Sequence, residues 1–78
     1  MYQADLEAFK RFYEATDNNL TWAEMPADII RQWVVEMMER GNVATSVRRR
    51  LSSLRSFYKF LLRRGLVTKD PAYNIPGP

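Results

Sequence analysis

Hydrophobic side chains recur every three or four residues along three stretches of this chain, and this spacing is typical of amphipathic α-helices. The predicted helices are Tyr2–Ala15, a second that starts near Pro26 and stops at Gly41, and a third from Ala44 to Arg64. Their apolar stripes contain Tyr2, Leu6, Phe9, Phe12 and Tyr13, then Ile29, Ile30, Trp33, Val34, Met37 and Met38, then Val47, Leu51, Leu54, Phe57, Tyr58, Leu61 and Leu62. No stretch alternates strongly enough for a β-strand, so we expect an all-α bundle with these stripes as its core.

The predicted helix ends carry recognisable capping residues. Pro26 suits a first helical position, where its missing N–H costs nothing. Gly41 and Gly65 each follow a predicted helix, and we expect both to adopt the left-handed conformation that ends many helices. Thr21 and Glu24 have the spacing of a capping box, but the box is expected to open only a short turn because Pro26 follows at once.

The C-terminal residues predict one more short element and a linker. Asp70 followed by Pro71 has the pattern of a helix cap and a first helical residue, which predicts a short fourth helix. Residues 74–78, Asn-Ile-Pro-Gly-Pro, cannot continue a helix and are interpreted as the start of a linker. A helical domain over residues 1–73, followed by this linker, is therefore expected.

The composition excludes several classes of function. The chain of 78 residues has no cysteine and no histidine, which rules out disulfides, zinc sites built from these ligands, and the usual general base at neutral pH. No apolar run approaches the roughly 20 residues that cross a bilayer, and the acidic, amphipathic start is unlike a signal peptide. We expect a soluble, cytoplasmic domain without a cofactor or a metal.

Charge is distributed unevenly along the chain. Residues 1–42 carry eight acidic and four basic side chains, a net charge of −4, although the whole chain has a net charge of +3. Residues 43–64 hold no acidic side chain and seven basic ones: Arg48, Arg49, Arg50, Arg55, Lys59, Arg63 and Arg64. A basic segment of this kind indicates a polyanionic partner.

The third predicted helix separates this charge from its apolar stripe. Placing residues about 100° apart puts Thr45, Ser46, Arg49, Ser52, Ser53, Ser56 and Arg63 on the outer side, with Arg48, Arg55 and Lys59 on one shoulder. Serines are weak helix formers, yet their short hydroxyl side chains would let the helix approach a phosphate backbone closely and donate hydrogen bonds. The flanking arginines could reach phosphates or the edge of guanine.

Other interpretations of this face stay open. The helix could present a basic surface to water alone, or dock on anionic lipid or in an acidic groove of a protein. Among nucleic acids the pattern favours duplex DNA over RNA only weakly. The chain has no glycine-rich phosphate loop and no glycine–aromatic signature of an RNA-binding sheet. Trp22 and Trp33 are expected in the core, whereas Phe60 projects away from the apolar stripe, toward the C-terminal residues or a further domain.

With these residues in view, the chain resembles the core-binding domain of tyrosine recombinases of the Xer and phage-integrase type over nearly its whole length. The resemblance is strongest at Ser46–Leu61 and continues through Gly65–Val67 and the Asp70–Ala72 turn. Tyr2–Phe9 resembles the family's second helix, and Ala27–Ile29 resembles the start of its third. The arginine, leucine and serine helix, followed by glycine and then by a proline–alanine turn, is a specific combination, although each part alone would be weak.

The resemblance implies a small SAM-like bundle of orthogonal helices that forms half of a C-shaped clamp around duplex DNA. In this family the helix that matches residues 45–64 enters the major groove by its N-terminal half, and a second contact lies near the start of the first helix here. Together with the outward positions, this gives the expected DNA-binding residues: Gln3, Thr45, Ser46, Arg48, Arg49, Ser52, Ser53 and Ser56, with Arg50, Arg55 and Lys59 as further phosphate contacts.

Two parts of the family are absent from these 78 residues. One is the family's first helix, which contributes to contacts between recombinase protomers, and the other is the catalytic domain, which carries the tyrosine nucleophile. Tyr58 lies on the apolar stripe and Tyr73 beside the linker, so neither is expected to attack a phosphate. We therefore expect a monomeric module that binds half of a recombination site during integration or recombination but does not cleave DNA. The alternative is a helical protein–protein module whose basic face meets an acidic partner.

Overall fold

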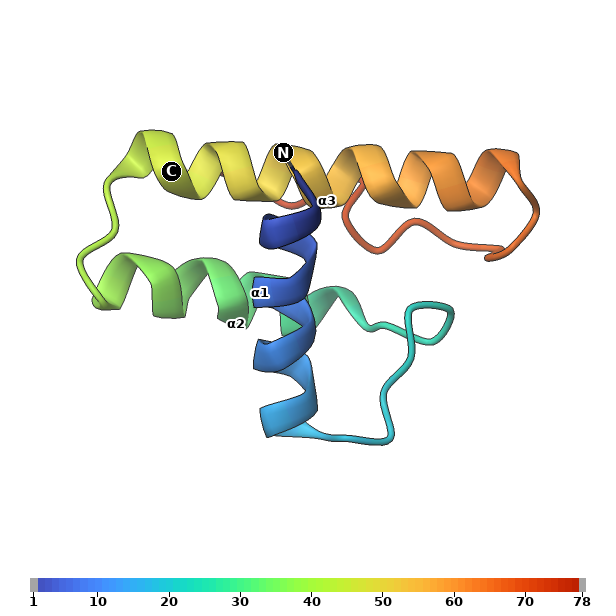
Figure 1. The fold of residues 1–78 in the computed structure, drawn as a ribbon, viewed down its shortest axis with the longest axis horizontal. Coiled ribbons are helices and arrows are strands. Elements are labelled where there is room, and N and C mark those ends of the chain that lie inside the picture. The colour runs from blue at the N-terminus through green and yellow to red at the C-terminus, as the bar shows by residue number, and fades with distance from the viewer. Residues whose placement is uncertain (1, 78) are drawn as a thin grey trace.

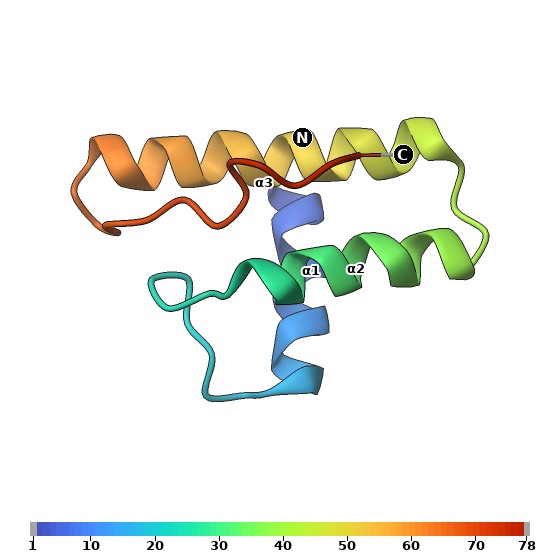
Figure 2. The same cartoon turned by 180° about the vertical axis from the view of Figure 1, so that it is seen from behind.

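A computed structural model describes residues 2–77, and in this part of the chain it contains three α-helices and no strand. Helix α1 spans Tyr2–Thr16, α2 spans Ala27–Glu39 and α3 spans Ala44–Arg63. Helices α2 and α3 run side by side, and α1 crosses them steeply on one face (Figure 1). Figure 2 shows the opposite face, where the segment after α3 turns back and lies along that helix. The predicted all-α bundle of orthogonal helices is confirmed.

The apolar stripes of the three helices meet in one core. Its buried members, which include residues from the loop before α2 and from the segment after α3, are Phe9, Tyr13, Met25, Ile29, Ile30, Trp33, Met37, Val47, Leu51, Leu54, Tyr58, Leu61, Val67, Ala72 and Ile75. The rings of Phe9 and Trp33 pack with their centroids 4.9 Å apart, a separation typical of aromatic pairs. The predicted core stripe of α3 is confirmed, whereas Met38 and Leu62, at the edges of their stripes, stay 42% and 39% exposed. The side chain of Tyr2, also predicted for the core, lies outside the described part of the chain.

Helices α2 and α3 end with the same backbone arrangement, as predicted. After α2, the Gly41 N–H donates to the Met38 carbonyl and the Asn42 N–H donates to the Met37 carbonyl, both at 3.1 Å. After α3, the Gly65 N–H donates to the Leu62 carbonyl at 3.0 Å and the Leu66 N–H donates to the Leu61 carbonyl at 2.9 Å. Both glycines have a positive φ, 86° and 70°, which a Cβ would disfavour. Pro26 has φ −77° and ψ 146°, so it caps α2 from outside instead of forming its first turn.

The loop between α1 and α2 contains the short turn predicted from the capping-box spacing. The Glu24 N–H donates to the Thr21 carbonyl at 3.2 Å and to the Thr21 hydroxyl oxygen at 3.3 Å. Between these two residues, Trp22 packs edge-on against Phe57 of α3, with ring centroids 4.9 Å apart. Helix α2 begins only after Pro26, so the turn covers the core without starting a helix.

The segment after α3 does not form the predicted fourth helix. Residues 71–74 are turns instead. The Asp70 carbonyl accepts the Tyr73 N–H at 3.2 Å, and the Asp70 carboxylate accepts the Ala72 N–H at 3.0 Å. The turn does not propagate, because a side chain competes for the backbone donor and because Pro76 disfavours helical geometry in the residue before it. The chain then continues without regular structure along α3 (Figure 2).

A guanidinium of α3 holds this segment in place. Arg55 Nε donates to the Ala72 carbonyl at 3.4 Å, and Arg55 Nη2 donates to the Ile75 carbonyl. Gly77 also lies on α3, so close that an added Cβ would be 3.5 Å from Arg48 Cγ. The segment therefore covers the flank of α3 opposite α1 (Figures 1 and 2).

Replacing Leu51 by alanine should destabilise the domain by about 2–5 kcal/mol, because the side chain is 1% exposed and its removal leaves a cavity in the core. Denaturant unfolding followed by circular dichroism measures the change. Ser52→Ala, at the next and exposed position of α3, is the control and should change the free energy of unfolding by less than about 0.5 kcal/mol. Equal unfolding midpoints for the two variants would contradict the core position of Leu51.

Candidate nucleic-acid interface

Helix α3 presents a basic side to solvent, away from the core. Its exposed residues include Thr45, Arg48, Arg49, Ser52, Ser56, Lys59 and Arg63, and Ser46 and Ser53 are half-buried. These residues share one side because positions three and four apart in a helix are neighbours on its surface. All the charged members are basic, so this side of α3 is positively charged. The structure thus brings together the hydroxyl and basic residues that the sequence placed outward.

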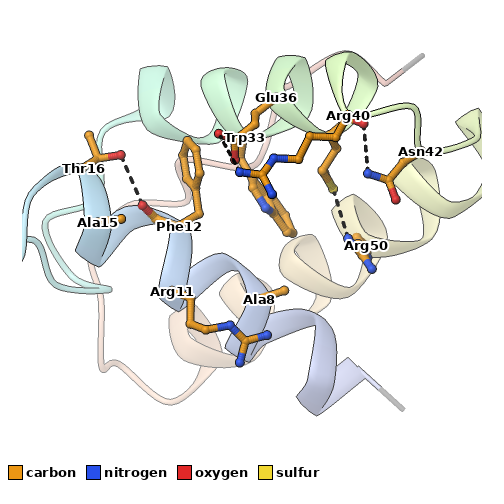
Figure 3. A pocket seen from close by; sticks show the side chains of 11 residues that line it. Ala8, Arg11, Phe12, Ala15, Thr16, Trp33, Glu36, Arg40, Asn42 and Arg50 are labelled. Atoms are coloured by element: carbon orange, nitrogen blue, oxygen red, sulfur yellow. Dashed lines mark hydrogen bonds and ion pairs between the residues drawn. The ribbon is translucent and has the colours of Figure 1, made fainter.

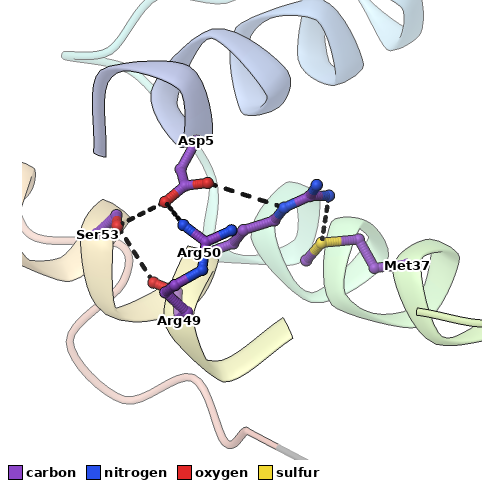
Figure 4. A network of polar contacts seen from close by, with 5 residues as sticks. All are labelled: Asp5, Met37, Arg49, Arg50 and Ser53. Carbon is purple, nitrogen blue, oxygen red and sulfur yellow. Dashed lines mark hydrogen bonds and ion pairs between the residues drawn. The ribbon is translucent and has the colours of Figure 1, made fainter. Parts of the chain in front are cut away.

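The first turns of α1 meet this side of α3 through one buried carboxylate (Figure 4). Asp5 Oδ2 accepts hydrogen bonds from Arg49 Nη1 and from Ser53 Oγ, both at 2.9 Å. Arg50 Nε lies 3.8 Å from Asp5 Oδ1, within ion-pair range but beyond a hydrogen bond. The side chain of Asp5 is 5% exposed, whereas that of Arg49 is 58% exposed. One end of this ion pair therefore lies in the protein and the other at its surface.

Sequence analysis did not identify Asp5 as part of the site. Asp5 lies four residues before Phe9, so helical periodicity places it on the apolar stripe of α1. A charged residue on a core stripe is seldom buried without a partner. The position of Asp5 on the stripe could therefore have indicated a buried ion pair. The partner could not be chosen from the sequence, because Arg49 is 44 residues away and α3 offers several other arginines.

The remaining predicted contacts lie in different places. Arg50 is half-buried and points toward α2, where its Nη1 lies 3.7 Å from Met37 Sδ (Figure 4). Arg55 is half-buried on the other flank of α3 and donates to carbonyls of the C-terminal segment. Gln3 is exposed in the first turn of α1, and Lys59 is exposed in the second half of α3. Arg50 and Arg55 are thus engaged with protein groups, and their contact with phosphate stays a prediction.

A cleft of about 590 Å³ opens between α1 and α2 (Figure 3). Its basic lining residues are Arg11, Arg40 and Arg50, which come from α1, the end of α2 and α3. Glu36 is its acidic lining residue and lies 3.8 Å from Arg40, and Trp33 contributes an aromatic wall. The cleft therefore has a net positive charge. It was not predicted, because it depends on how three helices cross and not on any one of them.

The two tryptophans belong to the packing of the domain, as predicted. Trp33 is buried, and Trp22 is half-buried against the aromatic core. Phe60 differs from both, because it is 41% exposed on α3. The guanidinium of Arg64 lies 5.5 Å from the centroid of its ring, within the range of a cation–π interaction. Phe60 and Arg64 therefore form an aromatic and cationic pair on the surface of α3 near its C-terminal end.

Tyr58 is a buried core residue, as its place on the apolar stripe predicted. Its hydroxyl donates to the Trp22 carbonyl at 2.8 Å, which joins α3 to the turn before α2. Burial raises the pKa of this phenol above its ordinary value of 10.0, and electrostatic interactions with Tyr13 and Asp70 raise it further. At neutral pH Tyr58 is therefore an un-ionised hydrogen-bond donor that stabilises the fold.

Comparison with known proteins identifies the family. The chain belongs to the phage integrase N-terminal SAM-like domain family, whose model matches residues 1–65. It is 40% identical over 77 residues to the tyrosine recombinase XerD of Rhizobium meliloti (strain 1021), an alignment that covers 99% of this chain and 24% of the relative. It is 31% identical over 77 residues to the tyrosine recombinase XerC of Roseiflexus castenholzii (strain DSM 13941 / HLO8), with the same two coverages, 99% and 24%. Over 57 residues it is 42% identical to XerC of Vibrio vulnificus (strain YJ016), covering 73% of this chain and 18% of the relative.

The resemblance to tyrosine recombinases predicted from the sequence is thus confirmed for this domain. The chain spans 24% of the length of the first two relatives. No solved structure matches the chain significantly. Within residues 2–77, no helix has the length and apolar character needed to cross a membrane. In the same part of the chain, acidic side chains do not gather into a group of three or more that could hold a metal ion.

Replacing Tyr58 by phenylalanine should destabilise the domain by about 1–3 kcal/mol at neutral pH, because the Trp22 carbonyl loses a buried donor. The wild-type domain should lose stability as the pH rises through and above 10.0, since the unfolded chain ionises this phenol there while the folded state resists ionisation. The variant should lose less stability over the same range. Denaturant unfolding of both proteins below and above this pH measures the two slopes, and equal slopes would exclude a contribution from Tyr58.

Proposed function

We propose that this domain is the DNA-binding module of a tyrosine recombinase and grips half of a recombination site in duplex DNA during integration or recombination. The observation that carries the proposal is the exposed side of α3, where basic and hydroxyl side chains are interleaved and α3 itself supplies no acidic residue. A helix that faces only water usually mixes both signs of charge, because like charges three or four residues apart repel. The carboxylate of Asp5 offsets only part of this positive charge, and the remainder supports a polyanionic partner.

The side chains on this surface suit a phosphate backbone. Ser52 and Ser56 are exposed, small and one helical turn apart, so they would let α3 approach DNA closely while donating hydrogen bonds. Arg49 and Arg63 flank them and could reach phosphates or the guanine edge in the major groove. Gln3, exposed in the first turn of α1, would add a contact beside them.

The chemistry of strand breakage belongs, in this proposal, to a part of the parent protein outside these residues. The relatives are named tyrosine recombinases, and this chain aligns with 24% of their length. We assign residues 1–73 to the DNA-binding domain and residues 74–78 to the start of a linker, whose first part packs on the domain because Ile75 is buried in the core. Other recombinase protomers on the same DNA would be its protein partners, and the protein would act in the bacterial cytoplasm, at the nucleoid when bound.

A second candidate function is a protein–protein module with an acidic partner. The cleft between α1 and α2 favours this candidate, because Arg11, Arg40 and Arg50 line it and Glu36 offsets only part of their charge. An acidic segment of another protein could bind there and neutralise the excess. Arg50 of α3 lines the cleft, but its other lining residues come from α1, α2 and the segment after α2, so one titration can distinguish the two candidates.

An amide-shift NMR titration with a short mixed-sequence DNA duplex makes this distinction. Binding as proposed should move the signals of Gln3, Thr45, Ser46, Arg49, Ser52 and Ser53 more than those of the cleft residues. The logarithm of the affinity should fall with the logarithm of salt concentration with a slope of about −4, if four or five phosphates are neutralised. Unchanged signals at low salt would overturn the DNA proposal, and equal affinity for heparin would favour the acidic protein partner.

Replacing Arg49 by alanine should weaken binding to the duplex about tenfold without unfolding the domain, because it removes an exposed guanidinium while Ser53 and Arg50 stay beside Asp5. Arg31→Ala, on the exposed side of α2, removes the same charge and is the matched control. Fluorescence anisotropy with a labelled duplex measures affinity, and circular dichroism measures melting. Lost stability with unchanged affinity in R49A would contradict the role assigned to this residue.

A further inference from the structure

The buried carboxylate of Asp5 connects the two parts of the domain that are proposed to contact DNA. It accepts hydrogen bonds from Arg49 and Ser53 of α3, both at 2.9 Å, and it lies two residues after Gln3 in α1. We propose that Asp5 is a positioning residue for DNA binding, which fixes the Arg49 guanidinium where α1 crosses α3 so that Arg49 meets the duplex in one orientation. This inference rests on the proposed function of the domain.

Arg49 is both anchored and accessible in this arrangement. Its Nη1 makes the contact with Asp5, while 58% of the side chain is exposed. A guanidinium is a rigid plane with five N–H donors, so fixing one of its corners also fixes the directions of the others. Arginine carries a large side-chain entropy, and a conformation fixed in advance reduces the entropy lost on binding.

The charge of Asp5 by itself opposes this role. A carboxylate beside DNA repels phosphates, so its removal would strengthen binding if long-range electrostatics were its only effect. The side chain of Asp5 is 5% exposed and is engaged by Arg49 and Ser53, so its strongest interactions are with these two groups and not with solvent. Positioning and long-range repulsion therefore predict opposite effects when the charge is removed.

A purely structural role predicts a different pattern again. Asp5 joins α1 to α3, so its loss could loosen the crossing of the two helices and weaken DNA binding at every contact. A positioning role acts through Arg49, and it disappears when Arg49 is absent. A double-mutant cycle between the two residues distinguishes these cases.

The cycle combines Asp5→Asn with Arg49→Ala and uses Glu7→Gln as the control for charge. Asparagine keeps the shape and one acceptor oxygen of Asp5, and Glu7 is exposed two residues further along α1, so E7Q removes an equal charge from the same helix. Affinity for a short mixed-sequence duplex is measured at two salt concentrations, together with the melting temperature of each variant. D5N should bind about tenfold more weakly than E7Q, and in the R49A background the two substitutions should give equal affinities.

The outcomes separate this inference from the proposed function. If the wild type binds the duplex and D5N binds as well as E7Q or better, Asp5 does not position Arg49, and the proposed function stands. If the deficit of D5N persists in the R49A background, Asp5 acts on the structure of the domain and the inference is wrong. If the wild type does not bind the duplex at all, the proposed function fails together with the inference.

A measurement on the wild-type domain tests the inference even if D5N unfolds. NMR relaxation of the Arg49 side-chain nitrogens should show restricted motion in the free domain. This motion should be comparable to that of the half-buried Arg55 and smaller than that of the exposed Arg11 on α1. Addition of the duplex should shift the Arg49 signals while leaving this restriction in place. Motion as free as that of Arg11 before DNA is added would overturn the inference.

Discussion

The packing of α3 on three sides is the constraint on which the rest of the structure depends. Helix α1 crosses one flank of α3, α2 lies beneath it, and the C-terminal segment covers the other flank (Figures 1 and 2). The 20 residues of α3 contribute five buried side chains to the core: Val47, Leu51, Leu54, Tyr58 and Leu61. Only the outward side is left for solvent. Most of the positive charge between residues 43 and 64 lies there because the other three directions are occupied, whereas Arg50 and Arg55 are half-buried on the other sides of α3.

The basic residues of α3 nevertheless differ in their surroundings. Arg49 and Arg50 approach the carboxylate of Asp5, and Arg55 donates to carbonyls of the C-terminal segment. Lys59 is exposed on the outward side. A count of basic side chains in the sequence therefore does not show that some of them also hold α1 and the C-terminal segment against α3. The same helix organises the bundle and forms its charged surface.

Much of the fold could be predicted from the sequence because it depends on local periodicity. The core stripe of α3, its outward serines and the glycines that end α2 and α3 all follow from residues within a turn or two of each other. The contact of Asp5 with Arg49 joins residues 44 apart, and no local pattern selects that pair. The predicted fourth helix is wrong partly for local reasons, since the Asp70 carboxylate accepts the Ala72 N–H and Pro76 disfavours helical geometry before it. A distant contact adds to these, because Arg55, 20 residues before Ile75, holds the same segment along α3.

The reversal of the chain after α3 determines where an attached group would lie. Gly77 lies next to Arg48 in the first half of α3, and not beside Gly65 at its far end. A dye, a purification tag or a surface tether joined after residue 77 would therefore stand close to the basic side of α3 and could screen it from a polymer in solution. The loop after α1, residues 17–20, is mostly exposed and lies at the end of α1 remote from α3 (Figure 1). A label placed in that loop would leave the charged side of the domain open.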